Sequence, residues 1–169
     1  MAQEPDSGSL NAFLLGLKRE LEAFRQFHQL LSAEQSALVK GDADGLMSLA
    51  QRKNDKVIEL TRLADTRNRY LAETIGGTNQ AGMTGWLDRY DPADKQGAGK
   101  LWRELIELAR TAKELNLLNG QLIHTHLAHN QEALRILLGA NTTTAHLYGA
   151  DGQAYATTPV GSGRPLGKA

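Results

Sequence analysis

The stretch LNAFLLGLKRELEAFRQFHQLLSAEQSAL, residues 10–38, decides the fold of this chain. Its apolar residues recur at alternating spacings of four and three, which is the heptad pattern of a helix that packs along one face. Three more apolar residues widen that face to the width expected in a helical bundle. The heptad positions are Leu10, Leu14, Leu17, Leu21, Phe24, His28, Leu31, Gln35 and Leu38, and the widening residues are Phe13, Phe27 and Leu30.

A second helix is predicted directly after the first. Gly41 suits the C-terminal end of a helix, and either Asp42 or Asp44 suits the N-cap of the next one. The heptad pattern then resumes over residues 43–75, although two basic residues interrupt the apolar face. Helices of about thirty residues joined by a tight turn must run antiparallel. The interrupting residues are Lys53 and Arg67.

A third long helix is predicted over residues 99–138, after a Gly-rich linker at residues 76–98. Within the linker, Thr84 could cap a short extra helix that carries Trp86 back onto the bundle. At ~1.5 Å per residue the third helix is ~60 Å long, so we expect it to overhang the first two.

These helices, at about 9–40, 43–75 and 99–138, predict an all-α fold: a long antiparallel three-helix bundle or coiled coil. A chain of 169 residues with 41% hydrophobic content suffices for one such core, which we place in residues 1–139. Residues 140–169 are rich in Thr, Gly, Ala and Pro and predict a flexible C-terminal tail.

Charge and cysteine content exclude several classes of function. The chain has 19 basic and 19 acidic residues, so no net charge favours nucleic acid or anionic lipid. It has no cysteine, which excludes disulfides and cysteine-based zinc sites. Residues 1–9 lack the pattern of a signal peptide, and the apolar runs are too short to span a bilayer. We therefore expect a cytoplasmic protein with no nucleic-acid partner and no direct membrane insertion.

Three histidines in the stretch ELNLLNGQLIHTHLAHNQEALRILLGA, residues 114–140, raise the question of a metal site. On a helix, His124 points roughly 140–160° away from His126 and His129, so the three cannot converge on one ion. No HExxH spacing occurs, and no P-loop or GxSxG motif is present. The acidic residues fall mostly at outward helix positions. The sequence therefore predicts no metal, no cofactor and no enzyme activity.

The third helix carries two apolar stripes, about 110° apart. The first holds Leu115, Leu118, Leu122, Ala133 and Ile136, shared with His126 and His129. The second holds Ile123, Leu127, Leu134 and Leu137, together with Gly120 and Asn130. A helix packed on one side needs one stripe. Either the bundle and the Trp86 segment cover both stripes, or a partner helix lies on the second one.

Gly120 stands in the middle of this helix. The pair Asn119-Gly120 is a common hairpin turn, but here its flanks have helical rather than strand-like periodicity. A glycine inside a helix costs about 1 kcal/mol relative to alanine. Gly120 is then either tolerated, or retained because another chain approaches closely there.

Three motifs resemble those of the FlgN family of flagellar type III export chaperones. They are LNLLNGQLI at residues 115–123, NQEALRIL at residues 130–137 and LYGADGQ at residues 147–153. The resemblance implies a cytoplasmic chaperone for the hook–filament junction proteins FlgK and FlgL. Such a chaperone binds their amphipathic C-terminal segments, prevents premature assembly, and delivers them to the export gate, whose component FlhA has a cytoplasmic docking domain.

The resemblance and the second stripe together give a set of candidate site residues. On family grounds Tyr148 is the candidate for docking to the export gate, the alternative being that it anchors the tail to the bundle. Asn119 and Asn130 could bond a partner's backbone, or they could be polar positions of the helix itself. The candidate partner-binding residues are Leu118, Asn119, Gly120, Leu122, Ile123, Leu127, Asn130, Leu134 and Leu137. The alternative function is a structural coiled coil that self-associates through the same stripe.

Overall fold

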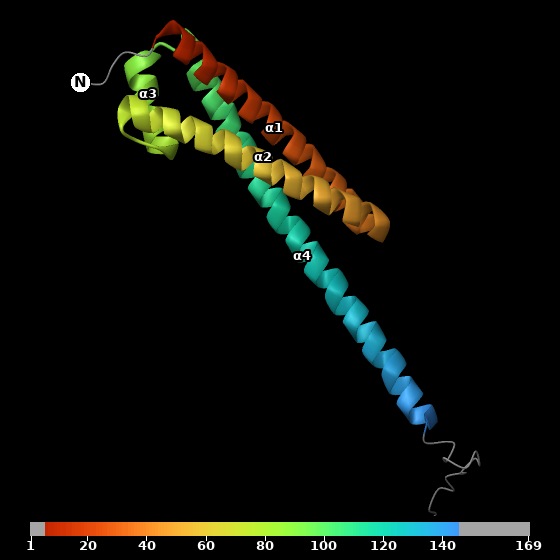
Figure 1. Cartoon of the computed structure of the whole chain (residues 1–169). Coiled ribbons are helices and arrows are strands. Elements are labelled where there is room, and N and C mark those ends of the chain that lie inside the picture. Colours follow the sequence, from red (N-terminus) through yellow and green to blue (C-terminus); the bar gives the residue numbers. More distant parts are fainter. Residues whose placement is uncertain (1–5, 146–169) are drawn as a thin grey trace, which may run out of the picture. The chain divides into compact units, whose positions relative to one another are not determined.

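The computed structural model describes the backbone of residues 6–145 and the side chains as far as Gly139. All the regular structure in this part of the chain is helical, which confirms the all-α class (Figure 1). The helices are α1, Ser7–Lys40; α2, Ala43–Ile75; α3, Asn79–Tyr90; and α4, Ala98–Ala145.

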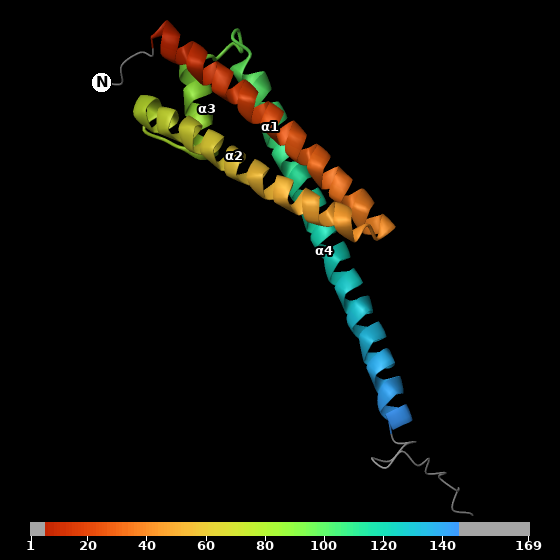
Figure 2. The ribbon, with the colours of Figure 1, turned by 45° about the vertical axis from the view of Figure 1, so that its right-hand side comes forward.

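The turn between α1 and α2 forms where the sequence places it. Gly41 takes the left-handed conformation with φ 70°, which favours glycine because it has no Cβ. Asp42, and not Asp44, is the N-cap of α2, and its carboxylate accepts the Gly45 N–H at 3.0 Å. The chain thus reverses within two residues, and α1 and α2 run antiparallel from their shared turn (Figure 2).

The linker holds a longer helix than the sequence predicts. We expected Thr84 to cap a short turn, but Thr78 precedes the helix, and the Thr84 hydroxyl donates to the Gln80 carbonyl inside it. Two glycines within α3 lower its intrinsic helix propensity, and packing overrides that cost. Trp86 does return to the core as predicted, and it is fully buried.

An aromatic cluster joins α3 to the end of the α1–α2 pair that lies away from the turn. The Phe13 ring stacks on Tyr70 with centroids 4.4 Å apart and meets Trp86 at 4.7 Å. Each buried aromatic ring removes a large apolar area from water, so this end of the bundle is held by burial. The buried cluster is Phe13, Leu17, Leu21, Leu71, Met83, Trp86, Ala98, Trp102 and Leu105.

The chain divides into two units, residues 1–123 and residues 124–169. Helix α4 has 48 residues, against 34 in α1 and 33 in α2. It continues past Leu138, where the sequence predicts its end, to Ala145, so Gly139 does not stop it. The predicted overhang, and the division into a domain of residues 1–139 and a tail of residues 140–169, stay predictions.

Candidate functional site

In the first unit, α4 turns a mixed polar and apolar face toward the bundle. Leu105 and Ala112 are buried, and Leu115 and Leu122 are half-buried. Between them lies Asn119, whose side chain is 1% exposed. Leu118, which we assigned to this face, is instead half exposed at 50%. The face is therefore rotated by about one residue from the predicted one.

Hydrogen bonds across to α1 explain this rotation. The Asn119 side-chain amide donates to the Leu31 carbonyl and to the Glu34 carboxylate, each at 2.8 Å. A buried carboxylate must be hydrogen-bonded or paired, so it selects the amide rather than the neighbouring leucine. The Glu34 carboxylate also accepts from the Lys53 ammonium of α2 at 2.6 Å. Three helices thus meet at one carboxylate.

A second buried ion pair lies two heptads away. The Glu20 carboxylate of α1 pairs with the Arg67 guanidinium of α2, which also lies 5.0 Å from the centre of the Trp102 ring in α4. Burial raises the pKa of Glu20 above its ordinary value, and the nearby Arg67 only partly offsets that shift. The prediction that acidic residues point outward is wrong for Glu20 and for Glu34, because each has a basic partner inside the bundle.

Sequence spacing carries a signal for these pairs that the heptad count missed. Glu20 and Glu34 are two heptads apart on α1, and Lys53 and Arg67 are two heptads apart on α2. In antiparallel helices such equal spacings allow both pairs to form at once. The basic residues that interrupt the apolar face of α2 are therefore the partners of the acidic residues on α1.

In the second unit, the part that the structure describes is helical as far as Ala145, and every residue from His124 to Gly139 is exposed. One line of side chains at heptad spacing is defined here as the exposed stripe: Leu127, Asn130, Leu134 and Leu137. Its three leucines are 53–63% exposed. The charges beside the stripe neutralise each other, since Arg135 donates to Glu132 at 3.1 Å.

The other candidate residues divide by exposure. Leu118, Gly120 and Ile123 are exposed in the first unit, and Leu122 is half-buried. A Cβ built on Gly120 would meet no atom within 4 Å, so its position is open to an approaching chain. Tyr148 lies outside the described residues. The predicted set is therefore accessible except at Leu122 and at Asn119, which the bundle uses for its own packing.

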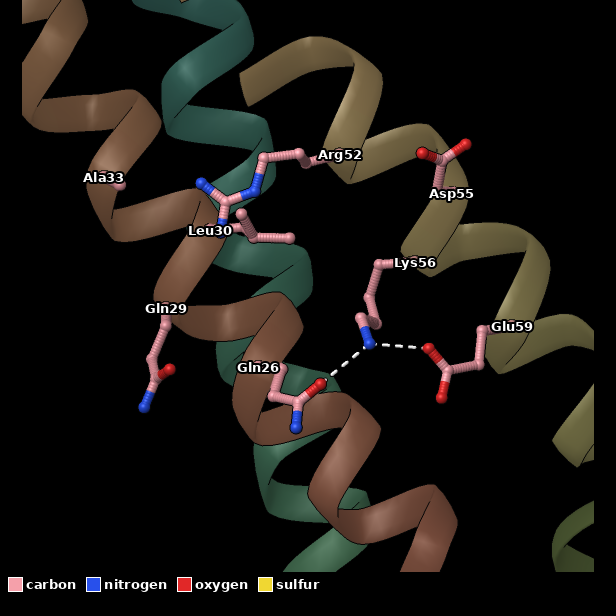
Figure 3. A pocket seen from close by; sticks show the side chains of 8 residues that line it. All are labelled: Gln26, Gln29, Leu30, Ala33, Arg52, Asp55, Lys56 and Glu59. Atoms are coloured by element: carbon pink, nitrogen blue, oxygen red, sulfur yellow. Dashed lines mark hydrogen bonds and ion pairs between the residues drawn. The ribbon is translucent and has the colours of Figure 1, made fainter. Parts of the chain in front are cut away.

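The hairpin surface has a polar groove between α1 and α2 (Figure 3). Lys56 crosses it from α2, donating to Gln26 at 2.7 Å and to Glu59 at 2.5 Å. Leu30 contributes an apolar patch, and Arg52 extends from α2 toward α1. Basic and acidic side chains balance in this groove, so it offers no selective attraction to a charged ligand.

Within residues 6–139, no three His, Cys, Asp or Glu side chains are grouped so that they could hold a metal ion. No described helix combines the length and apolar content needed to cross a membrane.

The fold and this surface define a class: all-helical proteins with an exposed apolar helix face. Comparison with known proteins narrows the class. The family model described as FlgN protein matches residues 1–156, and the chain belongs to the FlgN family.

Curated relatives share most of their length with this chain. The flagella synthesis protein FlgN of Proteus mirabilis is 31% identical over 141 residues, covering 82% of this chain and 86% of the relative. The protein of the same name from Yersinia enterocolitica is 28% identical over 148 residues, covering 86% and 90%. These names connect the family with flagella synthesis. No solved structure matches the chain.

Proposed function

We propose that this protein is a cytoplasmic flagellar export chaperone for the hook–filament junction proteins FlgK and FlgL. It binds their amphipathic C-terminal segments, prevents them from assembling prematurely, and delivers them to the FlhA component of the type III export gate. Family membership supports a part in flagellar synthesis. The function is one of binding and release, and it requires no reaction at the surface.

The exposed stripe carries this proposal. Fully burying a leucine gains about 1.5–3 kcal/mol, so three half-exposed leucines leave an appreciable part of that free energy ungained. An amphipathic helix laid along α4 would cover them, with its apolar residues at the same heptad spacing. Because Glu132 and Arg135 neutralise each other beside the stripe, the chemistry fits an uncharged apolar helix face.

One observation favours a second candidate, a self-associating scaffold. Asn130 interrupts the leucines of the stripe at a heptad position, and a single asparagine in such a position specifies pairing in coiled-coil dimers. A second copy of this chain could then supply the covering helix. The two candidates differ in whether the protein alone is a monomer or a stable oligomer.

Isothermal titration with C-terminal peptides of FlgK and FlgL tests the proposal. We expect saturable one-to-one binding by the wild type, and its loss in the Leu127→Asp, Leu134→Asp variant. The matched control is Leu15→Asp, Leu117→Asp, which alters two leucines of similar exposure, 49% and 64%, away from the stripe. Circular dichroism checks that both variants stay helical. A stable homo-oligomer that binds neither peptide would support the scaffold instead.

Gly120 and Tyr148 test two finer parts of the proposal. Gly120→Ala removes a helix-breaking residue in open space and should stabilise the free protein by about 1 kcal/mol. If a partner approaches closely at Gly120, the same change weakens peptide binding. Tyr148→Ala should reduce pull-down of the FlhA cytoplasmic domain and leave peptide binding intact; unchanged pull-down would remove Tyr148 from that role.

A further inference from the structure

Buried charge is segregated by sign between the two helices of the hairpin. Every Asp, Glu, Lys or Arg of α1 that is not exposed is acidic, and every one of α2 that is not exposed is basic. The side chains of Glu20 and Glu34 are 3% and 5% exposed, and those of Arg67 and Lys53 are 10% and 26% exposed. The outward faces of both helices carry charges of both signs. Segregation is therefore confined to the interface.

Stability alone does not account for these pairs. Moving two charges out of water costs about as much as their attraction returns, and apolar side chains in their place are often as stabilising or more so. Burial outweighs Arg67 in setting the pKa of Glu20, which is the sign of an incompletely compensated charge. What a buried pair does provide is selectivity, because any partner that lacks the opposite charge leaves a charge unpaired in the interior.

Helix α4 contacts one residue of each of the two buried ion pairs. Trp102 lies over Arg67 at 5.0 Å, and Asn119 donates to Glu34 at 2.8 Å. A foreign helix with a wholly apolar face cannot take the place of either hairpin helix without leaving charges unpaired. Replacing α2 it would leave both glutamates unpaired, and replacing α1 it would leave Arg67 and Lys53 unpaired. The exposed stripe, in contrast, contains no charged residue.

We propose that the ion pairs Glu20–Arg67 and Glu34–Lys53 are a specificity device, a charge code that reserves α1 and α2 for each other and keeps apolar amphipathic helices out of the hairpin. Such specificity matters most to a protein that binds apolar amphipathic helices, because a bound helix could otherwise replace α1 or α2. In that respect the inference rests on the proposed function. An incoming helix is then left with the uncharged stripe of α4 as its binding surface.

Two variants of the full chain test the code. The uncoded variant replaces all four residues with leucine: Glu20→Leu, Glu34→Leu, Lys53→Leu and Arg67→Leu. The exchanged variant keeps the pairs with their signs reversed: Glu20→Arg with Arg67→Glu, and Glu34→Lys with Lys53→Glu. The exchanged variant is the control for the hairpin pairs, because it alters the same four positions and retains charge complementarity between α1 and α2, while giving up the contacts of Trp102 and Asn119 with these positions.

The first probe is a synthetic peptide of residues 7–40 in which Glu20 and Glu34 are leucine, added to each protein while light scattering and titration follow association. We expect the uncoded variant to self-associate or to bind this peptide about tenfold or more tightly than wild type does. The exchanged variant should bind this peptide no more tightly than wild type does. An uncoded variant that stays monomeric and binds the peptide no better than wild type would overturn the proposal.

The FlgK and FlgL peptides are the second probe. On wild type they should bind once, and on the uncoded variant at more than one site. If wild type binds neither of them, the proposed function fails, yet the first probe still decides the charge code. If the uncoded variant does not fold, the single-pair variant Glu20→Leu, Arg67→Leu takes its place with the same readouts and the same deciding outcomes.

Discussion

Replacing Asn119 with alanine removes the only α4 side chain that hydrogen-bonds to Glu34 among the described residues. The lost amide makes two bonds of 2.8 Å, to the Leu31 carbonyl and to the Glu34 carboxylate. A hydrogen bond to a charged group contributes about 1.5–3 kcal/mol, and one to a neutral carbonyl about 1 kcal/mol. We expect Asn119→Ala to lower the free energy of unfolding by about 2.5–4 kcal/mol.

Urea denaturation followed by circular dichroism at helical wavelengths measures this loss. The control is Asn116→Ala, which removes the same side chain three residues earlier on α4, where Asn116 is exposed. An exposed substitution of this kind changes stability by about 0.5 kcal/mol or less. If Asn119→Ala costs no more than Asn116→Ala, then Asn119 does not lie in the bundle interior, and the rotation of α4 described above is wrong.

A double-mutant cycle separates the Asn119–Glu34 bond from the rest of the network. Glu34→Gln keeps the shape of the side chain, removes its charge and replaces one of its two acceptor oxygens with a donor NH2 group. Contacting residues in one network couple by about 0.5–3 kcal/mol, so the cost of Asn119→Ala should be smaller in the Glu34→Gln background than in wild type. Equal costs in the two backgrounds would show that the amide stabilises the fold without involving the carboxylate.

Three further predictions follow from the first unit. Gly82→Ala should destabilise the fold, because the new Cβ would lie 2.6 Å from the Gly77 carbonyl carbon. Gly85→Ala should instead stabilise α3 by about 0.5–1 kcal/mol, because the nearest neighbour of its Cβ lies at 3.4 Å. Thermal melts of the two variants compare these effects directly. Trp86→Ala should cost about 3–5 kcal/mol in urea titrations, and a loss under about 1 kcal/mol would contradict the burial of this ring. Partial desolvation opposes ionisation of Asp94, but hydrogen bonds from Arg103, Lys100 and Gly99 outweigh it and lower the pKa of that carboxyl. The stability that Asp94 contributes is therefore present above its ordinary pKa and is lost as pH falls through the lowered value, so Asp94→Asn should flatten the acid limb of the urea midpoint below about pH 4.

Much of the first unit could be predicted from local pattern. The heptads of α1 and the Gly41-Asp42 turn define an antiparallel hairpin, because helix period and cap chemistry depend on neighbours in sequence. The return of Trp86 to the core was also predictable, since a large aromatic ring near a bundle is expected to be buried. The length of α3 was not, because its glycines disfavour a helix, which the packing of Trp86 against Phe13 and Tyr70 stabilises.

The candidate surface was predictable in composition and less so in orientation. Leu118 and Asn119 are adjacent in sequence, and hydrophobicity assigns the leucine to the bundle. The structure reverses the assignment because Leu31 and Glu34 present acceptors that the Asn119 amide can satisfy and a leucine cannot. Those acceptors belong to a helix more than eighty residues earlier, so the local sequence of α4 contains no sign of them.

The sequence by itself determined that this protein is all-α, that its first two long helices form a hairpin, and that its motifs are those of the FlgN family. Periodicity and capping are properties of one helix at a time, and that is why they could be read directly. The tertiary structure decided which face of α4 meets the hairpin in the first unit and which acid pairs with which base. These choices depend on burial, because a charge or an amide removed from water must find its partner on another helix.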